Sequence, residues 1–427
     1  MPKLQNKIKK IAILPIEIAG YVAGLVNGFD AIGVKVWQIE LSAHKFEYDT
    51  KPLPLGLKFL IRTIRRLEAL PYALKVCTEL PLRLLLVLII ACRCDAIVCI
   101  FGKTLLPKNI DLWIYKLFRR KTCMVYLGSD SRPEYLNVRD LIQSKMNYEN
   151  LGKLIAKKKR RLTQIQSKVD FVVDNPMSWI LHNGSVTNWF SLGFPVVIDE
   201  INTPIAHLEK SNNKVKILHC PSNRLIKGSD EITIVIKELI QEGYPVELIE
   251  LTDVTRKEVI QHLLKVDLAI DQLYSDTPLA GFATECATVG VPVIVGSLAV
   301  DSLKNHFFKI GLDVPSILIN PSDLKLTLID LLQNRNKLKE ASDRATRFVR
   351  KEWSPSLVAS RFISLWSEGG ELFNVIPAEV SDATGIGLSE KNLNENLSKY
   401  YLVNGESGFH INTTTNAYKH LIDRAQL

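Results

Sequence analysis

Residues 271–295, DQLYSDTPLAGFATECATVGVPVIV, decide the fold of the second half of this chain. The apolar segment Asp267–Leu273 predicts a strand, and a loop containing Pro278 and Gly281 follows it. Phe282–Val289 then predicts a helix and Pro292–Val295 a further strand. A strand, a helix and a second strand in this order are typical of a βαβ unit in a parallel sheet.

The same alternation extends back to residue 215. Strands are predicted over Val215–His219 and Val246–Leu251, and a helix over Arg256–Leu264. Between the first two strands, apolar residues recur at helical spacing, which predicts one buried helix face. These residues are Ile232, Val235, Ile236, Leu239 and Ile240. The segment therefore predicts a doubly wound α/β domain.

The first half predicts a similar domain. A strand over Ile11–Leu14, a glycine-bearing loop, a helix over Tyr21–Ala31 and a strand over Val34–Leu41 make a βαβ opening. Further buried strands are predicted over Asp95–Phe101, Thr122–Leu127 and Asp170–Val173. The predicted fold class is thus α/β, with two tandem Rossmann-like doubly wound domains, which commonly hold a ligand in the cleft between them.

A length of 427 residues agrees with two or three domains. We place the first domain over residues 1–195 and the second over 196–368. The segment 369–427 is rich in Asn, Ser, Thr and Gly, which predicts a loosely packed polar extension.

The composition, 47% hydrophobic and 23% charged, is that of a folded globular protein and not of a disordered or multi-spanning membrane chain. Residues 1–200 carry 30 Lys and Arg against 17 Asp and Glu, whereas the remainder is mildly acidic. A basic half favours an anionic partner such as a phosphate-bearing ligand or an anionic membrane. We find neither a known module nor a basic stripe with interleaved aromatic residues, and therefore expect no nucleic-acid partner.

The chain is expected to be cytoplasmic. Glu17 interrupts the apolar run that follows the basic N-terminus, so this run is too short for a signal peptide. The longest apolar run, Leu84–Cys92, is about half of what a membrane span needs. The seven cysteines form no CxxC pair, which favours free thiols in a reducing compartment.

A candidate anion site follows the strand Val215–His219. Arg224 and Lys227 lie in the loop ahead of a helix N-terminus, where backbone N–H groups and the helix dipole already favour an anion. The pair suits a diphosphate group. Two solvated loop cations are the alternative.

A second candidate loop precedes the helix at Phe282. Gly281 lets the backbone approach a ligand closely, and Glu285, one turn later, offers a carboxylate that can accept two hydrogen bonds from a ribose. A carboxylate that only complements the helix dipole is the alternative.

Together, these motifs resemble the C-terminal domain of group 1 (family 4-like) glycosyltransferases of the GT-B fold. The resemblance covers about residues 214–365 and is most specific at Glu285-x4-Gly290-x-Pro292-Val293-Ile294. Gly20, the segment Gly128–Arg132 and the strand near residue 170 resemble that fold's acceptor domain more weakly. In such enzymes the C-terminal domain binds a nucleotide-sugar and the N-terminal domain binds the acceptor.

The resemblance implies that Arg224 and Lys227 contact the donor diphosphate and that Glu285 binds the ribose. The family's first motif Glu is replaced by Thr277, and Asp276 beside it is the candidate substitute for contacting the sugar. The implied donor-binding set is Gly20, Asn223, Arg224, Lys227, Gly228, Asp276, Thr277, Gly281 and Glu285.

The acceptor side lacks the His that many retaining members carry after the strand Asp95–Phe101. Retaining chemistry in this family needs only donor positioning and cations at the departing diphosphate, which Arg224 and Lys227 would supply. Inverting chemistry needs a carboxylate base, for which Glu17 and Asp130 are the candidates. For Asp130, a helix N-cap or a salt bridge to Arg132 is the alternative.

Residues 58–67 predict a basic amphipathic helix, either resting on an anionic membrane or lying on an ordinary surface. We treat His182 and His219 as structural, because neither has a partner at metal-ligand spacing.

The sequence therefore predicts a metal-independent hexosyltransferase that uses a nucleotide-diphosphate sugar, a saccharide or lipid-linked acceptor and no cofactor. It would be cytoplasmic or peripheral on the inner membrane face. The alternatives are a non-catalytic nucleotide-sugar-binding relative and a nucleotide-sugar epimerase.

Overall fold

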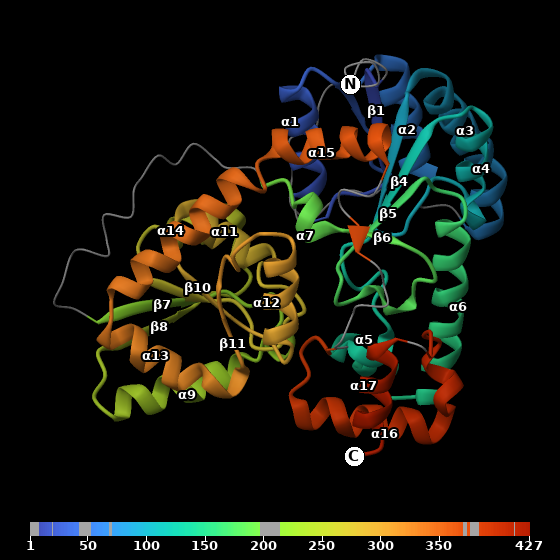
Figure 1. Ribbon diagram of the computed structural model, residues 1–427. Coiled ribbons are helices and arrows are strands. Elements are labelled where there is room, and N and C mark those ends of the chain that lie inside the picture. Colours follow the sequence, from blue (N-terminus) through green and yellow to red (C-terminus); the bar gives the residue numbers. More distant parts are fainter. Residues whose placement is uncertain are drawn as a thin grey trace. The chain divides into compact units, whose positions relative to one another are not determined.

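The computed structural model divides the chain into two compact units, each made of several chain segments (Figure 1). The first unit comprises Met1–Ser131, Lys157–Val197 and Trp353–Pro377; the second comprises Arg132–Ala156, Ile198–Glu352 and Ala378–Leu427. The predicted basic N-terminal segment and part of the predicted tail lie outside the described residues. The residues described are 8–18, 20–41, 53–67, 71–196, 214–369, 374–375, 384–413 and 415–427.

The first unit contains a seven-stranded sheet of order β12-β6-β5-β4-β3-β1-β2. All neighbouring strands pair in parallel except β12, which is antiparallel to β6. This confirms the predicted parallel sheet, although the second strand is shorter than predicted. The strands are β1 (Lys10–Leu14), β2 (Lys35–Gln38), β3 (Ala96–Ile100), β4 (Lys121–Val125), β5 (Phe171–Asp174), β6 (Val186–Asn188) and β12 (Asn374–Val375).

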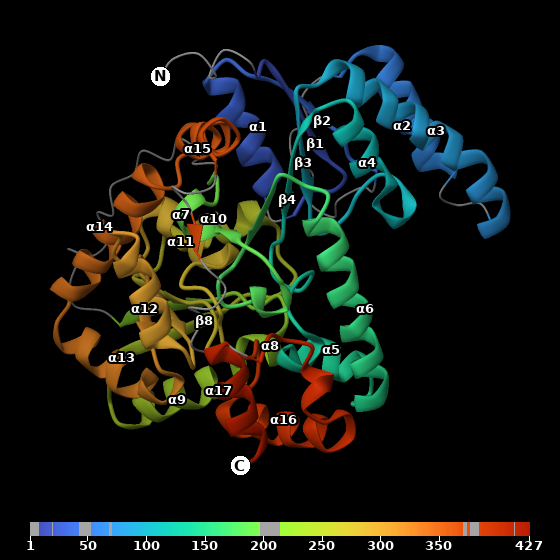
Figure 2. The same cartoon turned by 45° about the vertical axis from the view of Figure 1, so that its right-hand side comes forward.

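Helices cover both faces of this sheet, with α1 and α15 on one side and α3 and α4 on the other (Figure 2). The helices of this unit, together with α6, which begins in the second unit, are α1 (Tyr21–Ala31), α2 (Leu55–Leu67), α3 (Tyr72–Arg93), α4 (Ile110–Leu117), α6 (Tyr148–Gln166), α7 (Trp189–Leu192) and α15 (Pro355–Glu368).

Helix α15 joins the first unit although it falls inside the predicted second domain. Its start presses on α1 so closely that a Cβ atom at Gly28 would lie 2.0 Å from the Pro355 carbonyl oxygen. The rings of Phe29 and Phe362 also meet edge to face, with centroids 6.1 Å apart. The chain therefore returns to the first unit at residue 353, before the predicted limit of 368.

The second unit contains a five-stranded parallel sheet of order β11-β10-β9-β7-β8, which confirms the second doubly wound domain. Its core gathers Ile217 of β7, Ile270 of β9 and Ile236 of a covering helix, all essentially inaccessible to solvent. The strands are β7 (Val215–His219), β8 (Val246–Glu250), β9 (Leu268–Ile270), β10 (Val293–Gly296) and β11 (Ile317–Ile319).

Helices α9 and α13 cover one face of this sheet, and α11 and α14 the other (Figure 1). The helices of this unit are α5 (Val138–Gln143), α8 (Arg224–Lys227), α9 (Ser229–Gln241), α10 (Arg256–Leu263), α11 (Gly281–Val289), α12 (Val300–Lys309), α13 (Leu324–Gln333), α14 (Asn336–Lys351), α16 (Glu390–Asn404) and α17 (Asn416–Ala425). Of the helices in the described ranges, none is both long enough and apolar enough to cross a bilayer.

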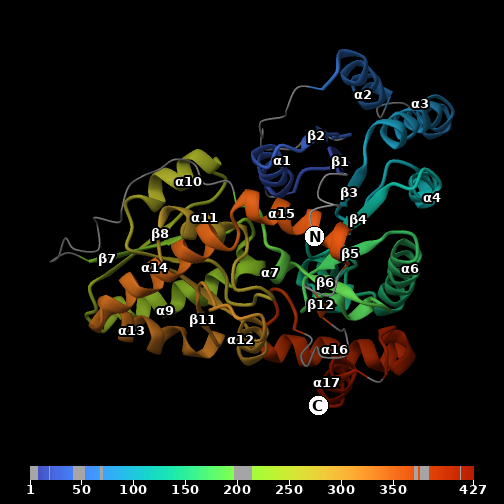
Figure 3. The ribbon, with the colours of Figure 1, turned by 45° about the horizontal axis from the view of Figure 1, so that its top comes forward.

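The expectation of a loosely packed tail is wrong for the described residues 384–413 and 415–427. Helices α16 and α17 lie side by side (Figure 3). The rings of Tyr400 and Phe409 pack on Tyr135, with centroids 4.9 and 5.1 Å from it, and all three side chains are fully buried. The Asn396 side chain donates to the Tyr135 carbonyl at 2.6 Å. The sparse apolar residues of the tail thus share a core with residues 134–136, from more than 250 positions earlier.

We predict that Phe409→Ala lowers the free energy of unfolding of the second unit by about 3–5 kcal/mol, because it opens a cavity beside Tyr135 and Tyr400. Leu402→Ala is the matched control on α16, since Leu402 is 82% exposed, and it should change stability by less than about 0.5 kcal/mol. Chemical denaturation of both variants checks this. Equal stability of the two variants would mean that the tail does not belong to the core.

Candidate functional site

The second sheet has a switch point at β7. Its strand order places β8 on one side of β7 and β9 on the other, so the chain runs from β7 to β8 and then crosses back to β9, and the direction reverses between β7 and β9. In open parallel sheets of this order, ligands bind outside the carboxyl ends of the two strands that flank the switch point. The loops after β7 and β9 are therefore the first place to search for a site.

The loop after β7 forms a tight turn that presents the two predicted cations. The Asn223 side chain caps α8 by accepting a hydrogen bond from the Ile226 N–H at 3.1 Å. Gly228 ends α8 with a φ of 68°, in the left-handed region that glycine adopts without strain. Arg224 and Lys227 begin and end this single turn of helix.

Lys227 reaches across the switch point. Its Nζ lies 2.6 Å from Oδ1 of Asp271, the residue that directly follows β9. The Asp271 side chain is fully buried, whereas 12% of the Lys227 side chain is exposed. An ammonium group has more than one N–H to donate, so Lys227 can hold Asp271 and still offer a donor toward the solvent side.

Arg224 is paired more loosely. Its guanidinium contacts Glu250 at the end of β8 and donates to Asp230 Oδ1 at 2.6 Å, and its side chain is 44% exposed. Exposed ion pairs are worth little free energy. An anion entering the loop can therefore compete with these carboxylates for Arg224.

Helix α11 begins at the end of the loop that follows β9. Its N-cap residue, Ala280, makes no side-chain cap, and a Cβ atom at Gly281 would meet no described atom within 4 Å. The first N–H groups of a helix favour an anion or a polar ligand, and the space beside Gly281 leaves room for one. One turn along α11, Glu285 accepts a hydrogen bond from Arg256 Nε at 3.0 Å and is partly exposed.

The residues where the family's first Glu would fall are buried. Thr277 bonds to the Leu279 backbone through its hydroxyl, at 3.3–3.4 Å. The Asp276 carboxylate is held by the Arg132 guanidinium, which donates to Asp276 Oδ2 through Nε at 3.1 Å and through a terminal nitrogen. Asp276, the candidate substitute, is therefore engaged in a buried ion pair.

His219 and Cys220 lie at the carboxyl end of β7. His219 is fully buried between the Ile270 carbonyl and the Ser229 hydroxyl, at 2.8 and 2.7 Å, and burial lowers the pKa of its ring. Burial also raises the pKa of the Cys220 thiol to about 11. Both side chains fit structural roles, as predicted for His219.

The C-terminal segment reaches the same loops. The Gly387 N–H donates to the Tyr274 carbonyl at 3.3 Å. Gly387 has a φ of 70°, and a Cβ atom there would lie 2.9 Å from Ile226 Cα, inside α8. The tail therefore supports the turn that carries Arg224 and Lys227, a contact that the sequence analysis did not foresee.

Two predicted residues of the first unit follow β1, at the switch point of its sheet. Gly20 precedes α1 with a φ of 78°. Glu17 is 1% exposed and accepts hydrogen bonds from the N–H groups of Val22 and Ala23 at 3.2 and 2.9 Å. Burial raises the pKa of Glu17 above its usual range, and its present contacts tie it to the first turn of α1.

Asp130 lies further along the carboxyl edge of the same sheet. Its carboxylate accepts a hydrogen bond from the Leu127 N–H at 3.0 Å, so neither the N-cap nor the Arg132 bridge describes it. Burial and the neighbouring Asp174 charge raise the pKa of Asp130 to about 7. A carboxyl group that titrates near neutrality is suited to proton transfer.

Asp174 and His182 form a buried pair that the sequence analysis missed. His182 Nε2 lies 3.1 Å from Asp174 Oδ2, and the Ser131 hydroxyl donates to Asp174 Oδ1 at 3.0 Å. Both side chains of the pair are inaccessible to solvent. The signal available in the sequence was Asp174 at the end of a predicted strand, with a histidine eight residues later.

The structure thus groups the predicted residues by unit. Glu17, Gly20 and Asp130 follow strands of the first sheet, whereas the remaining predicted residues follow strands β7 and β9 of the second. Within the described part of the chain, no three His, Cys, Asp or Glu side chains gather as a metal-binding group.

No protein-family model matches the chain, and no curated protein matches it by sequence. Among solved structures, the chain is similar to HepE of Anabaena in complex with UDP-glucose, at 11% identity and a TM-score of 0.47, over 84% of this chain and 100% of HepE. It is also similar to the MnaA–UDP structure of S. aureus (14%, 0.42, over 85% and 98%) and to the glycosyltransferase SnogD of Streptomyces nogalater (13%, 0.42, over 84% and 100%). Because these TM-scores lie below 0.5, the assignment of the site rests on the residues of this chain alone.

We predict that Asp130→Asn raises the melting temperature at pH 8 and leaves it nearly unchanged at pH 4. With a folded-state pKa of about 7, above the usual value of 3.8, Asp130 favours the folded state most at low pH and loses this contribution as the pH rises through 7. Asn keeps the acceptor for Leu127 and carries no charge at any pH.

Thermal unfolding at both pH values checks this, with Asp313→Asn as the matched control at an exposed carboxylate. A shift from Asp130→Asn that is equal at pH 4 and pH 8 would contradict the raised pKa.

Proposed function

We propose that the protein transfers a hexose from a nucleotide-diphosphate sugar to a hydroxyl group of a saccharide or lipid-linked saccharide. The observation that carries this proposal is the contact between Lys227 and Asp271, which holds a cation at the switch point of the second sheet. The sequence resemblance to group 1 glycosyltransferases extends over the same loops.

The donor would bind along the carboxyl edge of the second sheet. Lys227 and Arg224 would face the diphosphate, together with the first N–H groups of α11. Glu285, one turn further, would accept the ribose hydroxyl groups while Arg256 holds its carboxylate in place. Gly281 leaves room for the ligand because it has no side chain.

The loop of Asp276 and Thr277 would border the sugar. Since Asp276 is already paired with Arg132, its role in this proposal is to fix the loop, and Arg132 is a positioning residue. The contacts that select the sugar are then made by other groups of the loop, which distinguishes this chain from the family pattern.

Catalysis would depend on stabilising the departing diphosphate. A preorganised cation near the leaving oxygen lowers the barrier without a metal ion, and Lys227 is preorganised by Asp271. If the reaction inverts the anomeric carbon, a base must take the acceptor proton. Asp130, with a pKa near 7, suits this task better than Glu17, whose carboxylate is occupied by backbone N–H groups.

The acceptor would bind to the first unit, which is rich in basic residues. Residues 58–67 form most of α2, where Lys58, Arg62, Arg65 and Arg66 are exposed and Leu60, Ile61 and Ile64 are buried. Because the apolar face of α2 packs inside the protein, the proposed peripheral contact with an anionic membrane, at which a lipid-linked acceptor would be found, would be made by these four cations.

We predict that one nucleotide-sugar class, among UDP, GDP, ADP and dTDP sugars, raises the melting temperature selectively, since a bound ligand stabilises the native state. Glu285→Gln should weaken that binding by about tenfold or more, because one hydrogen bond to a charged group is worth about 1.5–3 kcal/mol. Calorimetric titration provides the affinities.

The diphosphate contact requires a paired substitution. Lys227→Met alone leaves the buried Asp271 charge uncompensated, so we use Lys227→Met with Asp271→Asn, which should also weaken binding by about tenfold. Lys237→Ala, at an exposed lysine of α9, is the matched control. Unchanged affinity in both site variants would refute the donor site.

Measuring turnover with and without an acceptor distinguishes the proposed transferase from the two alternatives. Transfer to an acceptor supports the proposal, binding without turnover supports the non-catalytic relative, and conversion of the donor sugar without an acceptor supports the epimerase.

A further inference from the structure

Helix α3 is longer than the sheet beside it requires. Its 22 residues span about 33 Å, whereas the five residues of β3, the strand that follows it, span about 17 Å. Among the side chains of α3 that the structure describes, the fully buried ones are Leu86, Val87, Ile90 and Ala91, all within its last eight residues. The earlier turns therefore extend past the strand with little of their surface covered by the sheet.

Apolar side chains along one side of α3 are exposed to solvent. Leu80, Leu84 and Leu88 recur every four residues, which places them in one row along the helix, and they are 40%, 41% and 38% exposed. Leu74 and Leu85 add exposures of 57% and 48%. A row of exposed leucines is unusual for a surface helix and indicates a binding surface.

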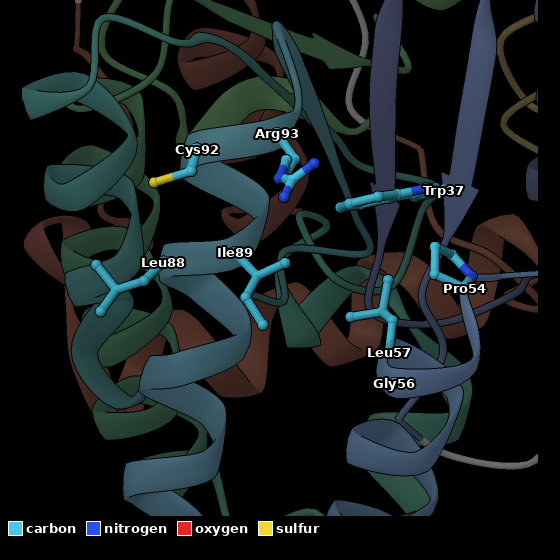
Figure 4. A pocket seen from close by; sticks show the side chains of 8 residues that line it. All are labelled: Trp37, Pro54, Gly56, Leu57, Leu88, Ile89, Cys92 and Arg93. Atoms are coloured by element: carbon cyan, nitrogen blue, oxygen red, sulfur yellow. The ribbon is translucent and has the colours of Figure 1, made fainter.

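A cavity of about 520 Å³ opens between α2 and α3. Figure 4 shows Ile89 of α3 and Leu57 of α2 pointing toward each other, with Arg93 beside Trp37 at one end. Leu88 lines the cavity and also belongs to the exposed row, so the two apolar surfaces are continuous. The cavity is lined by Trp37, Pro54, Gly56, Leu57, Leu88, Ile89, Cys92 and Arg93.

Basic residues predominate on the two helices that border this cavity. Helices α2 and α3 carry seven basic residues and one acidic residue, Glu79. Glu79 is buried and paired with Arg83, so it does not offset the exposed cations. At the cavity itself, Arg93 is exposed, and Lys10 Nζ lies 4.7 Å from the centroid of the Trp37 ring. The apolar cavity thus has cations at one end.

We propose that this cavity binds one hydrocarbon chain of an anionic membrane phospholipid. The chain lies between Leu57 and Ile89, the phosphate lies at Arg93 and Lys10, and the leucine row of α3 rests in the outer part of the bilayer. An apolar cavity with cations at one end matches a lipid tail with an anionic headgroup, whereas a polar soluble ligand would make no favourable contact with the apolar side chains that line the cavity. The site lies wholly in the first unit and does not depend on what the second unit binds.

The test uses the full chain and monomeric dihexanoyl phosphatidylglycerol, a short-chain anionic phospholipid, titrated below its micelle concentration. We expect saturable binding of one lipid per chain by calorimetry. Ile89→Glu places a charge in the chamber and should weaken binding by about tenfold or more. Leu326→Glu is the matched control, an exposed leucine of α13 in the second unit (69% exposed), and should leave binding unchanged.

The headgroup and the chain are tested separately. Arg93→Gln should weaken phosphatidylglycerol binding, and dihexanoyl phosphatidylcholine and glycerol phosphate should each bind more weakly than phosphatidylglycerol. Preferential binding of farnesyl phosphate would overturn the proposal by assigning the cavity to a polyprenyl ligand.

The position of the lipid chain in the cavity is tested by fluorescence quenching. A phospholipid with a brominated chain should quench Trp37, and Trp37→Phe should remove that quenching while the calorimetric binding remains. Quenching that persists in Trp37→Phe, affinity that is equal in the Ile89→Glu variant and the original chain, or no saturable binding at all would each overturn the proposal. The affinity of the Ile89→Glu variant for the nucleotide-sugar should be unchanged, which would show that the second unit is intact. A failure of lipid binding is therefore distinguishable from a failure of the proposed sugar transfer.

Discussion

The ion pair between Lys227 and Asp271 fixes the carboxyl edge of the second sheet. A carboxylate with no solvent exposure costs several kcal/mol unless a cation compensates it, so Lys227 is tied to the end of β9 although it belongs to the loop after β7. Asn223 and Gly228 shape the turn around it, and Gly387 of the tail packs against that turn. The chain thereby holds a cation where a parallel sheet of this order opens to ligands.

The alternation of strands and helices was predictable because each element follows from the pattern of apolar residues within its own segment. Apolar runs of four to eight residues predicted strands β1 to β5 of the first sheet and β7 to β10 of the second, and Val215–His219 agrees with β7 at both ends. The short strands β6 and β12 were not predicted. The residues that follow β7 and β9 could also be identified, since loops at the carboxyl ends of parallel strands share one edge. Local pattern therefore sufficed for most strands of the two sheets and for the loops in which the candidate site is sought.

The partners of those residues were not predictable, because they join distant parts of the chain. Arg132 meets Asp276 across 144 residues, and Arg256 meets Glu285 across 29. The tail was misjudged for the same reason. Its few aromatic residues look insufficient for a core until Tyr135 is placed among them. The composition of a segment reveals its own apolar side chains, but not the side chains that a distant segment contributes to the same core.

The most direct measurement is a crystal structure of the chain with the nucleoside diphosphate that stabilises it most. The Lys227 assignment predicts a diphosphate oxygen within hydrogen-bond distance of Lys227 Nζ and of the first N–H groups of α11, with the ribose hydroxyl groups on Glu285. A nucleotide bound away from β7 and β9, or a diphosphate held by a metal ion with Lys227 unchanged, would contradict it.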